Sequence, residues 1–388
     1  MNTQANSPRL GDMQRTALIA AAAGVLGCIA GAILDPGRFF ASYLFAFVFW
    51  SSISLGFLGI TMLHHMTSGR WSFLIQRISE SGMRVLPVLA LLFVPLLFGL
   101  GHLYPWVRHP EEEAIASRGA YLNVPFFILR TVLYFAIWIG MAFLLSRWSR
   151  RQDVAADSRL TRSLRLLSAP GLIVYALTAT FAAVDWTMSL QPEWYSTIYG
   201  MLAVVGQVLA ALALAAIVLR MLTASGPLAD VVAPRPLNDL GNMILAFVVL
   251  WAYMSFSQFL IIWAGNLPEE IPWYLRRLGG GWRAIRLLLI IFHFGVPFFL
   301  LLIRRSKRSL RILAWIAAGL LVMRVVDSYW IVMPGALPPG AAVHWIDLAA
   351  FLAVGGLWVV SFIRQIRVVP LLPLHDPRFA VLSEPVGG

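Results

Sequence analysis

Long apolar runs separated by short polar segments dominate the chain, and their lengths predict membrane-spanning helices. A helix rises about 1.5 Å per residue, so it needs about 20 mostly apolar residues to cross the hydrocarbon core. Ten runs qualify, at residues 16–34, 39–66, 83–103, 126–146, 166–184, 197–222, 239–264, 283–303, 309–333 and 345–363. We therefore predict an all-α polytopic membrane protein with about ten transmembrane helices.

The ends of the chain are predicted to lie outside the bilayer. Residues 1–388 form a single integral membrane domain in this interpretation, with a ten-helix region at 16–363 and cytoplasmic tails at 1–15 and 364–388. The first run is rich in alanine and follows Arg9 and Arg15, as in a signal peptide. Its length and the many later spans favour a retained first helix.

Composition agrees with this picture. Hydrophobic residues make up 60% of the 388 residues, charged residues only 12%, and the mean hydropathy is +0.78. A water-soluble globule is nearly excluded. The net charge of +12 would suggest nucleic acid in a soluble domain. Here the basic residues fall between apolar runs, where they indicate topology instead.

The distribution of arginine and lysine predicts the orientation, because cytoplasmic loops carry an excess of both. With both termini inside, 21 of the 30 basic residues fall in inside segments and seven in outside segments. The remaining two, Arg130 and Arg324, lie within predicted helices. This bias favours an even number of spans, with the N-terminus and the C-terminus inside.

Several kinds of chemistry have no support in the sequence. Cys28 is the only cysteine, which excludes an intrachain disulfide, a thiolate iron–sulfur cluster and a CxxCH haem attachment. No P-loop, HExxH, GxSxG or zinc-spaced pattern occurs. His293 has no second histidine at its depth to form a bis-histidine haem site. We predict no metal site, no bound redox cofactor and no catalytic residue in this chain.

Polar residues inside the predicted helices are the candidates for function, since charges in hydrocarbon are costly. Arg324 and Asp327 lie three residues apart on one helical face, and His293 is near mid-depth. The candidates for a proton path are Asp185, Arg324, Asp327, His293, His64 and His65. The alternatives are that Arg324 and Asp327 only neutralise one another and that His293 is a hydrogen-bonded core residue.

Further polar residues are expected near the outer level of Asp185 and Asp327. These are His102, Arg130, His344 and Asp347, which could complete a polar pocket beneath the outer surface. Residues 269–277 place acids before a proline and bases after it, which fits either a short surface helix or a linker. Small residues at 51–59 predict a close approach of another helix.

Four stretches resemble a known family. They are residues 54–71 (SLGFLGITMLHHMTSGRW), 185–200 (DWTMSLQPEWYSTIYG), 257–277 (SQFLIIWAGNLPEEIPWYLRR) and 293–304 (HFGVPFFLLLIR). They resemble the ActF subunit of bacterial alternative complex III, and the likeness extends over about residues 39–334. At 67–71 the chain reads TSGRW where the family commonly has TGG followed by Trp.

The resemblance implies a fold like that of the NrfD/PsrC-type membrane proteins. Two four-helix bundles, formed by helices 2–5 and 6–9, would be flanked by helices 1 and 10. The implied location is the bacterial inner membrane. The implied function is that of a subunit of a quinol:cytochrome c, or other quinol:electron-acceptor, oxidoreductase that supports assembly and translocates protons.

The resemblance also implies partners that carry the redox centres. An NrfD-like quinol-site subunit, an iron–sulfur subunit and c-type haem subunits would surround this chain, so haem c and iron–sulfur clusters are expected in the partners. Quinone or quinol binding by this chain stays open, and an apolar slot between helices 2 and 5 is one place for it. Competing interpretations are a stand-alone secondary transporter and a quinone-binding membrane anchor of another respiratory oxidoreductase.

Overall fold

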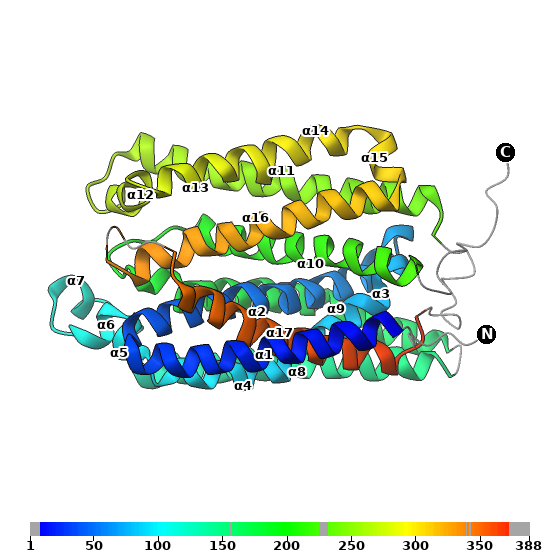
Figure 1. Ribbon diagram of the computed structural model, residues 1–388, viewed down its shortest axis with the longest axis horizontal. Helices are drawn as coiled ribbons and strands as arrows, with labels where there is room; N and C mark the ends of the chain where they lie inside the picture. Colours follow the sequence, from blue (N-terminus) through cyan, green and yellow to red (C-terminus); the bar gives the residue numbers. More distant parts are fainter. Residues whose placement is uncertain (1–7, 155–156, 225–231, 339, 341–342, 372–388) are drawn as a thin grey trace.

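The computed structural model describes residues 8–154, 157–224, 232–338, 340 and 343–371, and almost all of them are helical (Figure 1). The longer helices are α1 (Pro8–Leu34), α2 (Pro36–Thr67), α3 (Arg70–Met83), α4 (Leu86–Leu97), α8 (Val124–Gln152), α9 (Ser158–Trp186), α10 (Ile198–Ala224), α11 (Pro234–Gly265), α16 (Leu310–Ala336) and α17 (Trp345–Val368). The shorter ones are α5 (Leu100–Leu103), α6 (Pro105–Arg108), α7 (Glu113–Ala116), η1 (Met188–Leu190), α12 (Ile271–Leu278), α13 (Trp282–Leu288), η2 (Leu289–Gly295), α14 (Val296–Leu302) and α15 (Arg304–Arg308).

The prediction of an all-helical, multi-pass membrane protein is confirmed. Within the described ranges, eight helices are long and apolar enough to cross a membrane, or nine if the bent pair α3 and α4 counts as one span. Helix α16 coincides with the ninth predicted run and lies alongside α10 (Figure 1), but it is not among these eight. It buries Arg324 and Asp327 within its 27 residues.

Some predicted boundaries are wrong. Helix α1 begins at Pro8, so the second half of the predicted tail 1–15 is helical. Helix α17 continues to Val368, five residues beyond the predicted end of its span. The remainder of the predicted C-terminal tail, from residue 372, lies outside the described residues.

The third predicted span, 83–103, is not one helix. Its place is taken by α4, which has 12 residues, and by the short α5 after Gly99. Pro95 lies inside α4 and cannot donate a backbone hydrogen bond, which weakens its last turn. The preceding segment, which lies outside the ten predicted spans, forms the buried α3, and α3 and α4 meet at a bend of 40°.

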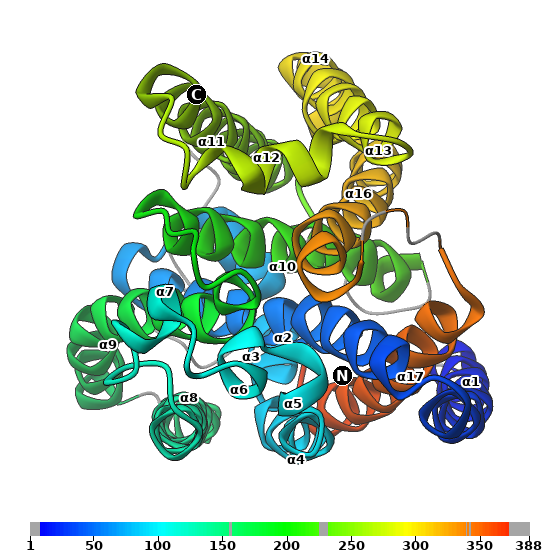
Figure 2. The same ribbon diagram turned by 90° about the vertical axis from the view of Figure 1, so that its left-hand side faces the viewer.

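Eight of the structural units pack into two rings of four, best seen end-on in Figure 2. In the first ring, α2, α4, α8 and α9 each contact the next and the circuit closes on α2. The second ring closes in the same way and consists of α10, α11, the continuous α13–η2–α14 segment and α16. Helix α2 also contacts α10 and α16, which joins the rings, and α1 pairs with α17 beside α2.

Small residues permit the closest helix contacts, as predicted for residues 51–59. A β-carbon on Gly56 would collide with the backbone carbonyl of Gln207 on α10, and one on Gly59 would stand 2.9 Å from the Tyr175 ring on α9. Gly24 lies equally close to the backbone of α17 at Ala353. Glycine at these positions lets backbones approach where lipid offers no hydrophobic driving force for association.

Of the two alternatives for residues 269–277, a short surface helix and a linker, the structure contains the helix, α12. It crosses the end of the second ring that lies opposite the start of α1 (Figure 2) and buries Trp273 and Arg277. We name this end of the molecule the outer end, and the opposite end the inner end, after the predicted orientation. Arg277 Nη1 donates to Gln191 Oε1 and Nη2 donates to the Ile331 carbonyl, both at 2.9 Å, and the guanidinium stacks on Trp273 at 3.7 Å. Burial lowers the pKa of Arg277 to about 9. These contacts fasten α12 to the outer end of α16.

Candidate functional site

Buried polar side chains occur at three levels along α2. Arg38 lies near the outer end of this 32-residue helix, Ser51 and Ser52 lie near its middle, and His64 and His65 lie at its inner end. At about 1.5 Å per residue, neighbouring levels are separated by about 20 Å. The levels correspond to outer ion pairs, a central cavity and an inner charged cluster, which we describe in that order.

Asp185 is the centre of one outer ion pair, within the first ring. Its carboxylate is 0% exposed and accepts from Arg130 Nε and Nη2, both at 2.9 Å, and from the Tyr134 hydroxyl at 2.8 Å. The Arg130 guanidinium lies over the Tyr121 ring at 3.9 Å. This bidentate pair, with a third donor, leaves the Asp185 charge well satisfied between α8 and α9.

A second outer pair joins α2 to α17. Arg38 Nε donates to Asp347 Oδ1 at 3.2 Å, and Arg38 Nη2 also pairs with Asp347 Oδ2. Tyr329 of α16 and Ser42 add their hydroxyls to the same carboxylate. The backbone N–H of His344 donates to Asp347 at 2.9 Å, which caps the start of α17. Asp347 was an expected outer polar residue, but its pairing with Arg38 of α2 was not predicted.

Arg324 and Asp327 form an ion pair on one face of α16, as the spacing predicted. Arg324 Nη1 donates to Asp327 Oδ2. Arg324 Nε is buried without a hydrogen-bond partner among the described residues. The guanidinium lies directly against Gly206 of α10, where a β-carbon would collide with it.

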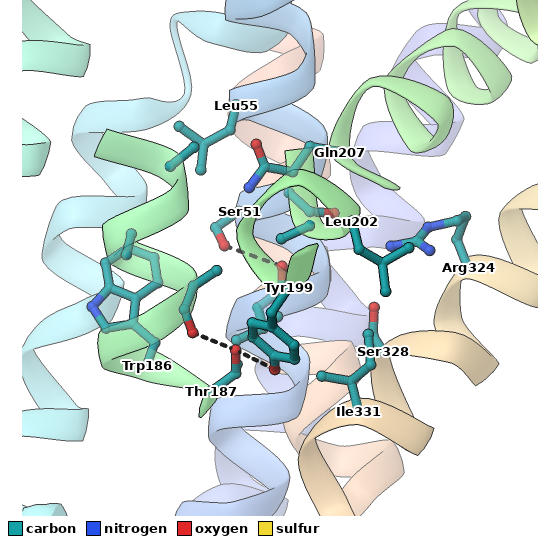
Figure 3. A pocket seen from close by; sticks show the side chains of 16 residues that line it. Ser51, Leu55, Trp186, Thr187, Tyr199, Leu202, Gln207, Arg324, Ser328 and Ile331 are labelled. Carbon is teal, nitrogen blue, oxygen red and sulfur yellow. Dashed lines mark hydrogen bonds between the residues drawn. The ribbon is translucent and has the colours of Figure 1, made fainter. Parts of the chain in front are cut away.

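The central cavity lies where the two rings meet, among α2, α9, α10 and α16 (Figure 3). Its volume is about 60 Å³, and a buried water needs roughly 10–15 Å³ measured in this way. The polar side chains in its wall are Ser51, Ser52, Thr187, Tyr199, Gln207, Arg324 and Ser328. A cavity of this size, with these polar side chains among its otherwise apolar lining, has room for several water molecules.

Hydrogen bonds already organise part of the cavity wall. The Tyr199 hydroxyl donates to Thr187 Oγ1 at 2.8 Å, and the Tyr175 hydroxyl donates to Gln207 Oε1 at the same distance. Figure 3 shows Arg324 reaching from α16 toward α10, with Ser328 beside it. The positive end of the Arg324–Asp327 pair therefore faces the cavity.

An inner cluster, absent from the predicted candidates, lies between α3 and α8. Glu80 is 0% exposed and accepts from Arg77 Nη1 at 2.8 Å, Ser149 Oγ at 2.7 Å and Gln76 Nε2 at 3.1 Å. Arg77 Nη2 also pairs with Asp153, the residue that follows α8. One feature of the sequence could have indicated this cluster: Glu80 is the only acidic residue between Asp35 and Glu111.

The inner cluster adjoins the two histidines at the end of α2. His64 Nδ1 lies 2.6 Å from Ser72 Oγ, and both histidines are 1% exposed. His65 is close enough to Glu80 to interact with its charge. The Arg84 guanidinium is also buried nearby, and none of its three nitrogens has a hydrogen-bond partner in the described chain.

His293 lies in the second ring, on the π-helical segment η2. Pro297, four residues later, has no N–H to offer the His293 carbonyl, and a wider turn accommodates this loss. The imidazole is 0% exposed, and its ring centroid lies 4.0 Å from that of Trp251. Neither ring nitrogen has a hydrogen-bond partner in the part of the chain that the structure describes. π-Helical turns are frequent at functional sites.

The structure thus separates the predicted candidates into groups. Arg324 and Asp327 are paired in the second ring, where His293 lies within electrostatic range of Arg324. Asp185 belongs to the first ring, and His64 and His65 belong to the inner end. The outer residues do not share one pocket: His102 stacks on Phe40 at 5.4 Å with an exposed side chain, apart from these ion pairs.

Across the described residues, no three His, Cys, Asp or Glu side chains gather as a metal site would require. Comparison with models of known protein families gives no match to this chain, and no curated protein is significantly similar to it.

Proposed function

We propose that the chain is an NrfD-like membrane subunit of a quinol:cytochrome c, or other quinol:electron-acceptor, oxidoreductase of the alternative complex III type, in the bacterial inner membrane. The observation that carries the proposal is the pair of four-membered rings flanked by α1 and α17. This is the arrangement that the resemblance of the four sequence stretches to ActF implies for helices 2–5 and 6–9.

The proposed orientation has ten spans with both ends inside. It counts the α3–α4 region and α16 as spans, in addition to the eight helices of sufficient length and hydropathy. The start of α1 and the end of α17 lie at the same end of the molecule (Figure 1), as an even number of spans requires. The arginine-rich last turns of α8 and first turns of α9 lie at that end too, in accord with an excess of basic residues inside.

In this proposal, partner subunits carry the electrons and this chain supports assembly and conducts protons. Haem c and iron–sulfur clusters belong to those partners. The proposed route starts at Glu80 and the His64–His65 pair, passes through the central cavity and leaves by way of Asp327 and Asp185. What supports it is that α2 contributes side chains to the inner and middle levels and borders the cavity that Arg324 faces. Water molecules in that cavity would connect these side chains through hydrogen bonds.

The test of the route measures protons moved per electron by the assembled complex in vesicles. Asp327→Asn is expected to lower the ratio while electron transfer continues, because the amide cannot exchange a proton at neutral pH. Glu80→Gln is expected to do the same from the inner side. Asp12→Asn, at an exposed position on α1, is the matched control. An unchanged ratio for both buried variants in intact complexes would refute proton conduction by this route.

A stand-alone secondary transporter is the competing proposal, supported by the buried intramembrane charges. Transporters built from repeats usually break their helices at corresponding places in both halves. Here the bend at α3–α4 and the π-helix η2 occupy different places in the order of their rings. Solute uptake into proteoliposomes by the purified chain alone would favour this alternative, as would a colourless preparation without partners.

A further inference from the structure

An open pocket lies at the inner end of the first ring, between the last turns of α8 and the start of α9. Its volume is about 660 Å³, and small-molecule sites occupy about 300–1,000 Å³. Figure 2 shows α8 and α9 side by side at the edge of the bundle, away from the second ring. The described residues that line the pocket are Arg147, Arg150, Arg151, Val154, Asp157 and Leu160. This lining is mostly basic, which points to an anionic occupant.

The positive charge of this pocket is not neutralised within the described chain. Three arginines against one aspartate leave two positive charges in its wall, and none of the three arginines has an ion-pair partner among the described residues. The Asp157 side chain is engaged at the start of α9, where it accepts from the backbone N–H of Arg159 at 2.8 Å. Arg147 and Arg151 are four residues apart on one helix, where like charges repel.

The neighbouring inner cluster has no negative charge to spare for this pocket. Arg77 pairs with both Glu80 and Asp153, and Glu80 is also within electrostatic range of Arg84. Two acids thus balance two arginines in the cluster. Arg150, in the pocket wall, is within electrostatic range of Arg84 and adds to the repulsion there. A countercharge for the pocket has to come from a molecule other than the described chain.

The surface around the pocket places it at the boundary between headgroups and hydrocarbon. Phe143 precedes Arg147 by about one turn of α8 and is 55% exposed, and Leu166 follows Arg165 directly on α9 and is 63% exposed. Arg147 and Arg165 lie about 8 and 10 Å from the inner ends of their helices. Both helices therefore change from basic to apolar at nearly the same level. Lipid phosphates gather at such a level, and their acyl chains cover the apolar side chains beyond it.

We propose that this pocket binds the headgroup of a lipid with two phosphodiesters, of the cardiolipin type. Its two negative charges match the two unbalanced positive charges of the wall, and arginine donates to a phosphate through two N–H groups at once. Basic pockets between helices at the cytoplasmic face are suited to such headgroups. The acyl chains lie against the exposed apolar side chains of α8 and α9, such as Phe143 and Leu166. The proposal concerns lipid binding only and does not depend on the proposed function.

The test is native mass spectrometry of the full chain, purified in mild detergent and titrated with cardiolipin or with phosphatidylglycerol at equal phosphate concentration. Cardiolipin is expected to fill one saturable site at least roughly tenfold more tightly than phosphatidylglycerol, which carries a single phosphate. Arg147→Gln with Arg151→Gln is expected to weaken cardiolipin binding by roughly tenfold or more, because two charge-assisted contacts are lost. Arg159→Gln with Arg162→Gln is the matched control. It makes the same change of charge at exposed positions on α9 that do not line the pocket, and it should change the affinity by less than about threefold.

A second variant tests the pocket from its other wall. Leu160→Glu adds an acid to the lining, in the first turn of α9, where a carboxylate suits the helix dipole and the fold is retained. The added negative charge is expected to weaken cardiolipin binding by roughly tenfold as well.

Several results would overturn the proposal. Equal affinity for the two lipids would indicate general attraction of anionic lipids to this end of the molecule. Displacement of cardiolipin by inorganic phosphate at equal concentration would indicate a site for the free anion. Wild-type affinity of the pocket variants, or an equal loss in the control, would place the lipid elsewhere. If the double pocket variant does not fold, as judged by its elution profile, Leu160→Glu against the control decides the outcome. Because the readout is lipid bound to this chain, it is independent of which partners co-purify and of any proton movement.

Discussion

The two rings differ in how completely their buried polar groups are hydrogen-bonded. In the first ring and the α3 helix packed on it, Asp185 and Glu80 each accept three hydrogen bonds from neighbouring side chains. In the second ring, His293 lies against Trp251 with no hydrogen-bond partner for either of its ring nitrogens among the described residues. Saturated networks fix a structure. An unsatisfied group leaves its surroundings less firmly fixed.

The backbone shows the same contrast. Helix α2 is buried along nearly all of its length between its neighbours, whereas the second ring contains the π-helix η2 and a pocket of about 690 Å³ between α11 and the α13–η2 segment. Only 22% of the most apolar part of α11 is buried, compared with 89% for α2. We infer that the first ring supplies the rigid frame and that the second ring supplies space for rearrangement.

The largest expected effect comes from breaking a saturated pair in the first ring. Asp185→Asn leaves the buried Arg130 without a countercharge, and such a loss costs about 3–5 kcal/mol. Thermal unfolding in detergent should show a large fall in the melting temperature. The double variant Asp185→Asn with Arg130→Met should recover most of it, because no charge is left unpaired. A single variant as stable as the wild type would contradict the assignment of this ring as the rigid frame.

A smaller effect is expected at the contact between the rings. Gly206→Ala forces Arg324 away from α10, and overpacking of this kind costs about 1–3 kcal/mol, partly offset by the better helix propensity of alanine. Gly319→Ala on α16 has open space around its β-carbon and is the matched control, expected to gain up to about 1 kcal/mol. Equal stabilities of the two variants would show that Arg324 is free to move.

The smallest effect is expected for His293→Phe in the second ring. The imidazole makes no hydrogen bond with the described residues, so a phenyl ring loses no partner and removes a costly buried polar group. The free energy of unfolding should fall by no more than about 1 kcal/mol, or should rise. The melting temperature in detergent checks this. A loss as large as that of Asp185→Asn would mean that His293 is held in a network as tight as that of the first ring.

The sequence predicted the helices better than it predicted their polar contacts. Hydropathy located every long apolar helix because lipid imposes one length and one composition on a span. It missed α3, whose sequence RWSFLIQRISESGM is too polar to stand out, although the protein buries it almost entirely. Spacing identified the Arg324–Asp327 pair because both residues lie on one helix.

Contacts between distant segments were beyond the reach of sequence patterns. Arg38 and Asp347 are 309 residues apart, and Arg77 pairs with Asp153, 76 residues later, at the end of α8. The prediction that the outer polar residues share one pocket was wrong for the same reason. The depth of a residue in the membrane does not say which helices are neighbours. The pocket between α11 and the α13–η2 segment depends on how far these two stand apart, which no single helix encodes.

The central claim is that this chain is the membrane part of a quinol-oxidising complex. It is tested most directly by identifying the subunits that co-purify with the chain. The tagged chain should be purified from its native membrane in mild detergent, and its reduced-minus-oxidised visible spectrum and subunit composition should be recorded. The account predicts c-type haem bands together with an iron–sulfur subunit and a second NrfD-like subunit. A colourless chain that elutes alone would contradict it.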